Sequence, residues 1–378
     1  MNKLVRILKK EPMLFVSLAA AVISLFITPP DADLLKGIDW KTLATLFMLL
    51  SVLDGFKHEN LFLPVIRFTG HMKTQLALSF FLVFGVFFSS MFVTNDVSLI
   101  IFVPLTIMLF RQQKKEQYIL PILTMENVAA IRGSLLTPFG SPQNLFLFSN
   151  SNMDTGSFLL MMLPLWLGSI VLIAAFICFI YRRDLREVTV SVSAGTEQWT
   201  PEGRTRRIVY LSLFAVIILC IVTRTAYWPW VTLLVATVLL IFDRNVFRRV
   251  DYVLLLTFFC FFVFSSSVSR NPGIASFLKS SVTGHEYWWS IGISQIIANV
   301  PAAIVLWPFT GEGNLPALIY GLDTAGLVSI IGSLASVINL RIYIREYPGN
   351  GRRFMAVFEK ISLSFFVIVV FLQLLLLK

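Results

Sequence analysis

Two short polar stretches interrupt long apolar segments, and their residue types could bind a small solute or an ion. They read SMFVTND at residues 90–96 and SQIIANV at residues 294–300. A constant spacing of 204 positions separates four identical pairs: Ser90 and Ser294, Asn95 and Asn299, Pro104 and Pro308, and Thr106 and Thr310. A repeat with polar breaks inside apolar segments is typical of secondary transporters.

The first polar stretch contains a carboxylate, the group that costs most in a membrane. Thr94, Asn95 and Asp96 are expected at the tip of a helical hairpin near the bilayer midplane, with Asn299 at a second tip. Helix ends expose N–H groups that favour an anion, whereas carbonyls and a carboxylate favour Na+ or H+. We therefore predict a Na+ site near these residues, although the two asparagines could simply cap the hairpin arms. Asp96 is the stronger candidate because an unpaired carboxylate is costly in hydrocarbon; its repeat partner is Val300.

Two further segments combine helix breakers with small polar residues. The sequence TPFGSPQN at 137–144 contains prolines and a glycine that an intact helix excludes, and GSLAS at 332–336 forms a second break. The candidate binding residues here are Thr137, Gly140, Ser141, Asn144, Ser333, Ser336 and Asn339. A spacing of 195 positions aligns two pairs: Ser141 with Ser336, and Asn144 with Asn339. We expect a site shared between the repeats or, alternatively, kinked helices whose polar side chains bond to their own backbone.

Charged and amide side chains also lie in the helices that precede the breaks. Asn127 and Asp323, 196 positions apart, could help to coordinate a cation or proton, or could only pack. Glu126 and Arg132 are six residues apart and so lack the spacing of a direct helical pair. Arg132 could bind an anion or neutralise Asp96.

The composition restricts the class of protein. The chain has 378 residues, of which 57% are hydrophobic and 14% charged, and its mean hydropathy is +0.80. Several apolar runs approach the length of a spanning helix, so the sequence predicts an all-α polytopic membrane protein. The three histidines flank the apolar runs, and no metal-ligand spacing or nucleophile–base pair is visible, so we expect neither enzyme activity nor a cofactor other than a coupling Na+ or H+. The net charge of +10 indicates membrane topology rather than nucleic-acid binding.

The order of apolar runs and breaks predicts two repeats. Residues 1–190 would form the first, residues 191–206 a cytoplasmic linker, and residues 207–378 a connector helix followed by the second. Each repeat would contain a re-entrant helical hairpin and a broken transmembrane helix. The first hairpin has predicted arms at 74–93 and 97–110, and its second arm would reach only about 21 Å, short of a hydrocarbon core of about 30 Å.

Positive charges predict the orientation. With the N-terminus in the cytoplasm, 24 of the 31 Lys and Arg residues lie in cytoplasmic segments. The first hairpin would then enter from inside and the second, at 287–310, from outside, so the repeats are expected to be inverted. The apolar run after the basic N-terminus has no convincing cleavage site, which predicts a retained first helix in the cell membrane.

These motifs resemble the ion transporter superfamily, most closely the branch of arsenite permeases, citrate–metal permeases and sodium–proton antiporters, which is related to the divalent-anion symporters. The resemblance covers nearly the whole chain and rests on residues 94–97 with Pro104, 137–144, 294–301 and 332–336. It implies a homodimer in which a mobile, elevator-like transport region carries the hairpins and broken helices past a scaffold region.

Three positions depart from the pattern of these relatives. The tips read TND and ANV where the divalent-anion branch has Ser-Asn-Thr, which weakens the case for a dicarboxylate. Ile131-Arg132-Gly133 stands where relatives often have Asn-Leu or Asn-Ile-Gly, and Ser141 replaces a common asparagine. The added arginine could change the charge of the substrate or replace a coupling cation.

The function expected from the sequence is secondary active transport of a small anionic solute, coupled to Na+ or H+. The alternatives are a cation–proton antiporter or an arsenite-type efflux permease, and a channel or a membrane enzyme is least expected. The expected partners are the small-molecule or ion substrate, the lipid bilayer and a second copy of the chain.

Overall fold

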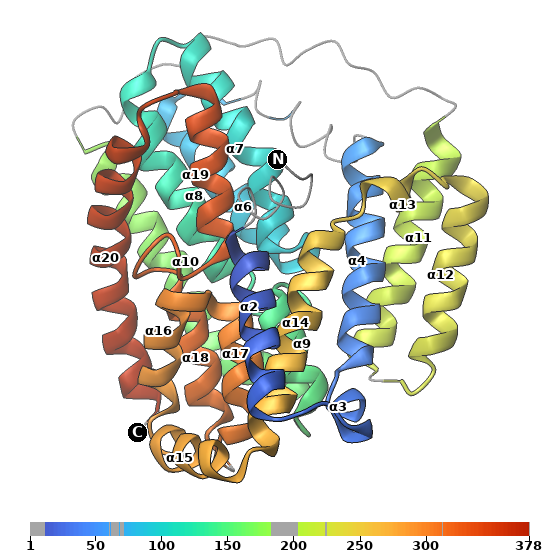
Figure 1. Ribbon diagram of the computed structural model, residues 1–378. Coiled ribbons are helices and arrows are strands. Elements are labelled where there is room, and N and C mark those ends of the chain that lie inside the picture. The colour runs from blue at the N-terminus through green and yellow to red at the C-terminus, as the bar shows by residue number, and fades with distance from the viewer. Residues whose placement is uncertain are drawn as a thin grey trace.

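The computed structural model describes residues 12–59, 61, 68, 72–182, 203–223, 225–311 and 313–377. Within these ranges the chain forms a helical bundle whose long helices run roughly parallel to one axis (Figure 1). Six helices are long and apolar enough to cross a membrane, which confirms the predicted all-α polytopic fold. Most of the predicted linker at 191–206 lies outside the described residues.

One side of the bundle forms what we call the scaffold helices. They are α2 (Pro12–Ile27), α4 (Trp40–His58), α11 (Gly203–Val222), α12 (Trp228–Phe242), α13 (Val246–Arg249) and α14 (Tyr252–Arg270). α2 packs along α14, while α11, α12 and α13 pack on α4 (Figure 1). The short helices α3 (Ala32–Lys36) and α15 (Pro272–Val282) lie at one end of this group, and α15 occupies a segment of mixed composition.

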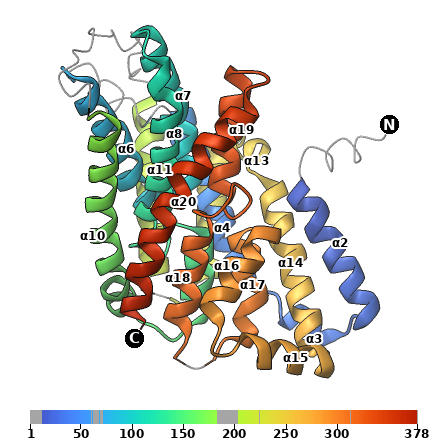
Figure 2. The same ribbon diagram turned by 90° about the vertical axis from the view of Figure 1, so that its left-hand side faces the viewer.

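The other side contains the predicted hairpins and broken helices, which we call the transport helices. From the first half come α6 (Gln75–Val93), α7 (Asn95–Gln112), α8 (Ile119–Gly133), α9 (Pro142–Asn150) and α10 (Thr155–Ile180). From the second half come α16 (Glu286–Ile297), α17 (Asn299–Leu306), α18 (Leu315–Ala325), α19 (Leu334–Glu346) and α20 (Gly351–Leu376). α6 packs on α7 and α8 in the upper half of the bundle, and α16 packs on α17 and α18 in the lower half (Figures 1 and 2).

The first hairpin is longer than predicted. α7 has 18 residues, which corresponds to about 27 Å, because Asn95 and Asp96 belong to its first turn instead of a loop. Polar side chains suit this turn, since its N–H groups lack helical partners; Asn95 Oδ1 accepts from the Asp96 N–H at 2.9 Å. In the second hairpin α16 has 12 residues and α17 has 8, so neither arm can cross about 30 Å of hydrocarbon.

The helix breaks also differ from their predicted positions. The first spans residues 134–141 and the second residues 326–333. Pro142 stands in the first turn of α9, where proline is tolerated because the N–H it lacks would have no partner. Ser336, which was predicted to lie within the second break, lies inside α19 instead.

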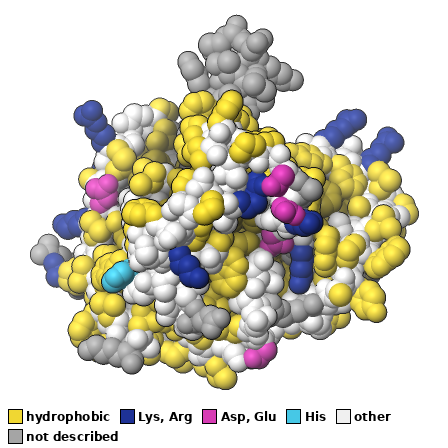
Figure 3. Space-filling model, turned by 60° about the horizontal axis from the view of Figure 1, so that its bottom comes forward, with side chains coloured by type: hydrophobic (Ala, Val, Ile, Leu, Met, Phe, Trp, Pro, Cys, Tyr) yellow, Lys and Arg dark blue, Asp and Glu magenta, His cyan; other side chains and the backbone are white. Residues whose placement is uncertain are grey.

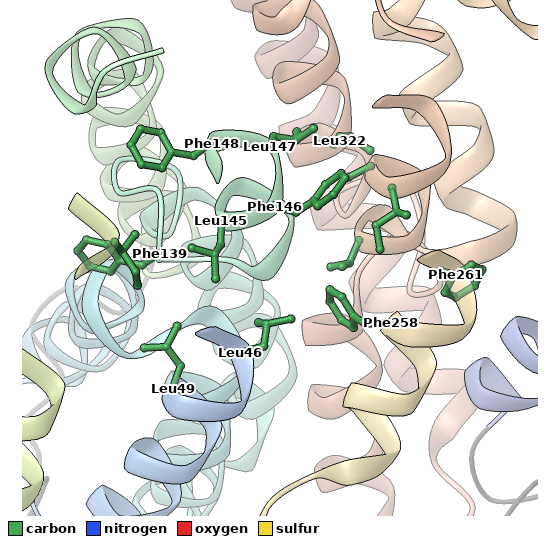
Figure 4. Packing of buried hydrophobic residues seen from close by; sticks show 14 of the residues in the cluster. Leu46, Leu49, Phe139, Leu145, Phe146, Leu147, Phe148, Phe258, Phe261 and Leu322 are labelled. Atoms are coloured by element: carbon green, nitrogen blue, oxygen red, sulfur yellow. The ribbon is translucent and has the colours of Figure 1, made fainter. Parts of the chain in front are cut away.

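Aromatic packing holds α9 in the middle of the bundle. Figure 4 shows Phe146 and Leu145 of α9 among side chains of α4 and α14. The ring centroids of Phe146 and Phe262 are 5.6 Å apart, and Phe148 meets Phe158 of α10 edge-on at 5.7 Å. These contacts fix the short helix, and therefore the break before it, against both groups of helices.

The outer surface fits a lipid environment. Figure 3 shows hydrophobic side chains over much of one face, with charged side chains in small groups. Large apolar residues such as Trp230 on α12 and Phe371 on α20 are more than half exposed. A face of this kind is expected for helices that contact lipid tails.

An ion-pair network ties the scaffold helices together at one end. Arg249 Nε donates to Asp54 at 2.6 Å, and its Nη2 donates to Asp243 Oδ2 at 2.8 Å. The Tyr210 hydroxyl donates to the same oxygen at 2.9 Å. Burial raises the pKa of the Asp243 carboxyl, but the hydrogen bonds from Arg249 and Tyr210 outweigh burial and hold that pKa below its ordinary value.

This network should weaken in acid. Because the pKa of Asp243 is lower in the folded than in the unfolded state, its contribution to stability is fully present above about pH 4 and is lost as pH falls through the folded value. In thermal unfolding in detergent, Asp243→Asn should therefore be less stable than wild type at neutral pH, and the difference should shrink in acid.

The exposed Asp33, which pairs with Lys36 on the surface, provides the control. The thermal stability of Asp33→Asn should differ only slightly from that of wild type at every pH. If the difference in thermal stability between wild type and Asp243→Asn stays constant across the acidic range, Asp243 does not make this pH-dependent contribution.

Candidate transport site

A single residue in an uncommon backbone conformation forms the turn of each hairpin. Thr94 has φ 70° and ψ 155°, and Ala298 has φ 65° and ψ 165°. This region is almost closed to residues with a Cβ, and such strain costs about 1–3 kcal/mol. Thr94 and Ala298 are 204 positions apart, so the spacing found in the sequence extends to the backbone geometry.

Each hairpin tip is joined to a neighbouring helix break by a backbone hydrogen bond. The Asn95 N–H donates to the Gly140 carbonyl at 3.3 Å, and the Asn299 N–H donates to the Gly332 carbonyl at 3.2 Å. A Cβ on Gly332 would lie 2.1 Å from the Ala325 carbonyl oxygen. Glycine is therefore required where the second break approaches its hairpin.

These bonds correct the predicted alignment of the two breaks. Gly140 and Gly332 are 192 positions apart, and so are Ser141 and Ser333, which both occupy N-cap positions. The spacing of 195, which paired Ser141 with Ser336 and the two asparagines with each other, is wrong. It matched residue types alone, whereas the caps are set by the backbone at which each helix begins.

A cavity of about 450 Å³ lies between the hairpin tips and the scaffold helices. Thr94, Asp96 and Ala298 line it from the two tips, Ser141 lines it from the first break, and α2, α4 and α14 provide mostly apolar walls. The structure thus brings both tips to one cavity. Asn95 and Asn299 are placed differently from expectation: they are 7% and 5% exposed and do not line the cavity.

Arg132 is enclosed between helices of both halves. It is 1% exposed, and its Nε donates to Ser169 of α10 at 3.0 Å. The Asp323 carboxylate on α18 attracts its positive charge at longer range than a hydrogen bond, an interaction that the sequence did not predict. Gln143 of α9 donates to the same carboxylate. Arg132, Asp323 and Gln143 therefore form one polar group contributed by α8, α18 and α9, the helices next to the two breaks.

Buried amides connect the same two halves. Asn127 Nδ2 donates to Ser336 Oγ at 2.9 Å, and Asn339 Nδ2 donates to the Leu123 carbonyl at 2.7 Å. All four residues are fully buried. The structure therefore brings three of the predicted residues together between α8 and α19.

Several buried polar atoms of this site have no hydrogen-bond partner within the described parts of the chain. They are Arg132 Nη1, Asn127 Oδ1, Gln143 Oε1, Asn144 Oδ1, Asp323 Oδ2 and Asn339 Oδ1. An unsatisfied buried polar atom costs about 1–3 kcal/mol. A solute, ion or water that satisfied these atoms would gain that free energy on binding.

The remaining predicted residues have structural roles, and two contributors were missed. The Thr137 hydroxyl donates to the Met91 carbonyl of α6, and Ser333 begins α19. Gln143 and Ser169 were not selected from the sequence. Gln143 lies within the break predicted at 137–144 and could have been found there, whereas Ser169 lies in an apolar helix whose sequence indicated no polar site.

Comparison with known proteins decides the family. The family model described as "Citrate transporter" (CitMHS) matches residues 4–332, which is most of the chain. The chain belongs to the citrate transporter family. This confirms the resemblance inferred from the hairpin and break motifs.

Two curated relatives are similar to this citrate transporter family member over most of its length. "Inner membrane protein YbiR" of Escherichia coli K12 is 30% identical over 312 residues, which cover 81% of this chain and 80% of that protein. "Uncharacterized transporter MJ0456" of Methanocaldococcus jannaschii is 29% identical over 331 residues, covering 87% of this chain and 88% of that protein. These names indicate a multi-pass membrane transporter rather than an enzyme.

The strain at the hairpin turns can be measured. Ala298→Gly removes the Cβ that makes φ 65° unfavourable, so it should raise the thermal stability of this citrate transporter family member in detergent. Ala303→Gly is the matched control because Ala303 lies within helix α17, where glycine costs about 0.5–1 kcal/mol. If both variants lose stability equally, the turn at Ala298 is not strained.

Proposed function

We propose that this membrane transporter is a secondary active transporter of a small anionic solute, coupled to Na+ or H+. The observation that carries the proposal is the enclosed guanidinium of Arg132, which keeps one nitrogen without a partner beside the two helix breaks. A planar guanidinium suits carboxylates and other oxyanions, which it can bind with two parallel hydrogen bonds. Citrate, named in the description of the family, is an anion of this class.

The charges around the cavity support the need for a coupling cation. Asp96 is a carboxylate on the cavity wall, which Arg249 and Arg341 also line, whereas Arg132 and Asp323 lie outside the cavity lining. Two like charges about 4 Å apart repel by about 4 kcal/mol at an effective dielectric constant of about 20. An anion next to Asp96 would bind more tightly if Na+ or H+ bound to that carboxylate, which would link anion binding to cation binding.

The architecture supports alternating access. We infer that residues 1–190 and 207–378 are inverted repeats, since their hairpins occupy opposite halves of the bundle and share turn geometry and backbone contacts (Figure 1). The transport helices would move as an elevator against the scaffold helices, with the cavity between them. A homodimer with cytoplasmic N-termini and re-entrant hairpins belongs to the same proposal.

One observation favours a second function. The cavity is lined by three carboxylates, those of Asp54, Asp96 and Asp251, and by two guanidinium groups, those of Arg249 and Arg341. A net negative site would also suit a cation–proton antiporter. An arsenite-type efflux permease is a further alternative within the same class.

Proteoliposomes with an imposed Na+ or pH gradient test the proposal. Labelled citrate and inorganic oxyanions should accumulate above their equilibrium level when either gradient is present. Downhill flux alone would indicate a channel. Cation uptake linked to proton exit in the absence of any anion would indicate the antiporter.

Asp96 should carry the response to Na+. Asp96→Asn removes the half-buried carboxylate from the cavity and should leave solute exchange intact while abolishing stimulation by a Na+ gradient. Asp251→Asn is the matched control, because Asp251 lines the same cavity and caps α14, a role that asparagine also fulfils. Unchanged Na+ stimulation in Asp96→Asn would assign coupling to another group, with Asp323 next.

Arg132 should determine anion affinity. Arg132→Lys keeps the charge but loses the planar fork, so the KM for the anion should rise about ten- to a hundredfold, the equivalent of one charged hydrogen bond. Arg207→Lys, at another buried arginine on the scaffold helix α11, should leave KM unchanged. An unchanged KM in Arg132→Lys would limit Arg132 to neutralising Asp323.

A further inference from the structure

A second carboxyl group lies inside the transport helices, away from the cavity. Glu126 of α8 is 0% exposed and receives one hydrogen bond, from the Thr106 hydroxyl of α7. Its other oxygen, Oε2, has no hydrogen-bond partner among the described residues. Glu126 is about 9 Å from Arg132 along the helix axis and contributes nothing to the site described above.

The helices that pack on α8 bring no buried charge to Glu126. α6 and α10 carry no acidic or basic residue, and α7 carries only Asp96 at the hairpin tip and Arg111 at its other end. The charged side chains of α19, α20 and the turn at 116–118 are exposed: Glu116, Arg341, Arg345, Glu346, Arg352, Arg353, Glu359 and Lys360. Tyr343 of α19 and Tyr118 are buried but uncharged at neutral pH. On α8 itself the charged residue is Arg132, which faces Asp323.

An ionised Glu126 would therefore be a lone charge in an apolar core. Burying an unpaired carboxylate costs several kcal/mol, and one hydroxyl donor does not compensate for the lost water. The favoured form in this conformation is the neutral acid. The proton of this neutral Glu126 is therefore distinct from any proton that binds to Asp96 or Asp323.

We propose that Glu126 is the proton-binding site of this transporter, loaded in the conformation described and unloaded when α7 moves away from α8. The proposal rests on the proposed transport function. The step transfers one proton from the carboxylic acid to water that reaches it and leaves a carboxylate, which the same water solvates. Thr106, the residue that contacts Glu126, lies on the second arm of the first hairpin, so a displacement of that arm would change the environment of the acid.

Two features of α7 and α8 support such a release. Pro104, two residues before Thr106, removes a backbone hydrogen bond inside α7 and weakens the helix where it faces Glu126. Glu126 lies about 10 Å along α8 from Ile119, at the end of the bundle predicted to face the cytoplasm. Separation of α7 from α8 at this end would give the carboxyl a short route to water.

Infrared spectroscopy of the purified protein tests the protonation without a substrate. At neutral pH the wild type should show the carbonyl stretch of a protonated, weakly hydrogen-bonded carboxylic acid, and Glu126→Gln should lack it. Glu346→Gln, at an exposed acid that pairs with Arg111, should retain it. Thr106→Val removes one hydrogen bond to Glu126 and should therefore shift the band. If Glu126→Gln does not fold, Thr106→Val takes its place in the test. A wild-type protein without a Glu126-dependent band would overturn the proposal.

Transport in proteoliposomes then tests the coupling, with labelled citrate as the probe. A gradient of one pH unit can support about tenfold accumulation per coupled proton. Glu126→Gln should lose this accumulation while keeping citrate exchange and any response to Na+. Retained pH-driven accumulation in Glu126→Gln would overturn the proton site but leave the proposed function standing. If the wild type accumulates no anion under either gradient, the proposed function fails, whereas the infrared band still reports on Glu126.

Discussion

Inside hydrocarbon, a backbone N–H or C=O group without a partner costs several kcal/mol, and this chain interrupts its helices at four places within the bundle. The structure meets this constraint by pairing the interruptions. Each hairpin tip donates its first N–H to the carbonyl of a glycine in the neighbouring break, Asn95 to Gly140 and Asn299 to Gly332. The rest of the transport region depends on these two contacts, because they place two turns and two helix N-termini around one cavity.

The same constraint applies to charge. Arg132 and Asp323 come from different halves and are both buried, and the charge of each offsets part of the cost of burying the other. Asp96 lies on the cavity wall and can exchange ions with it, whereas Glu126 is enclosed and has one hydroxyl partner. The three carboxyl groups can thus have different roles: Asp323 as a counter-charge for Arg132, Asp96 as a cation ligand and Glu126 as a proton site.

The cavity that Asp96 lines lies between the transport helices, which we propose to move, and the scaffold helices. The hairpin tips and the first break contribute Thr94, Asp96 and Ser141, while the scaffold side contributes apolar residues of α2, α4 and α14 together with Asp54, Arg249 and Asp251. In the proposed elevator movement, the apolar residues of these walls would form no hydrogen bonds that hold the tips in one position. The ion pairs of Arg249 with Asp54 and Asp243, in contrast, hold the scaffold helices as one unit.

The sequence by itself determined the membrane class, the order of helices and breaks, and the spacing of 204 that relates the hairpins. These features are local: apolar runs, prolines and glycines act on the residues next to them. Boundaries shifted where a polar residue suits a helix start as well as a loop, as Asn95, Asp96 and Ser336 show.

Only the tertiary structure decided which polar groups meet. It paired Arg132 with Asp323, Glu126 with Thr106 and Asn127 with Ser336, and it directed Asp96 rather than Asn95 to the cavity. Successive residues on a helix point about 100° apart, so a contact between helices depends on how each is rotated and packed. That rotation is set by side chains such as Phe146 and Phe262, which are more than a hundred residues apart in the chain.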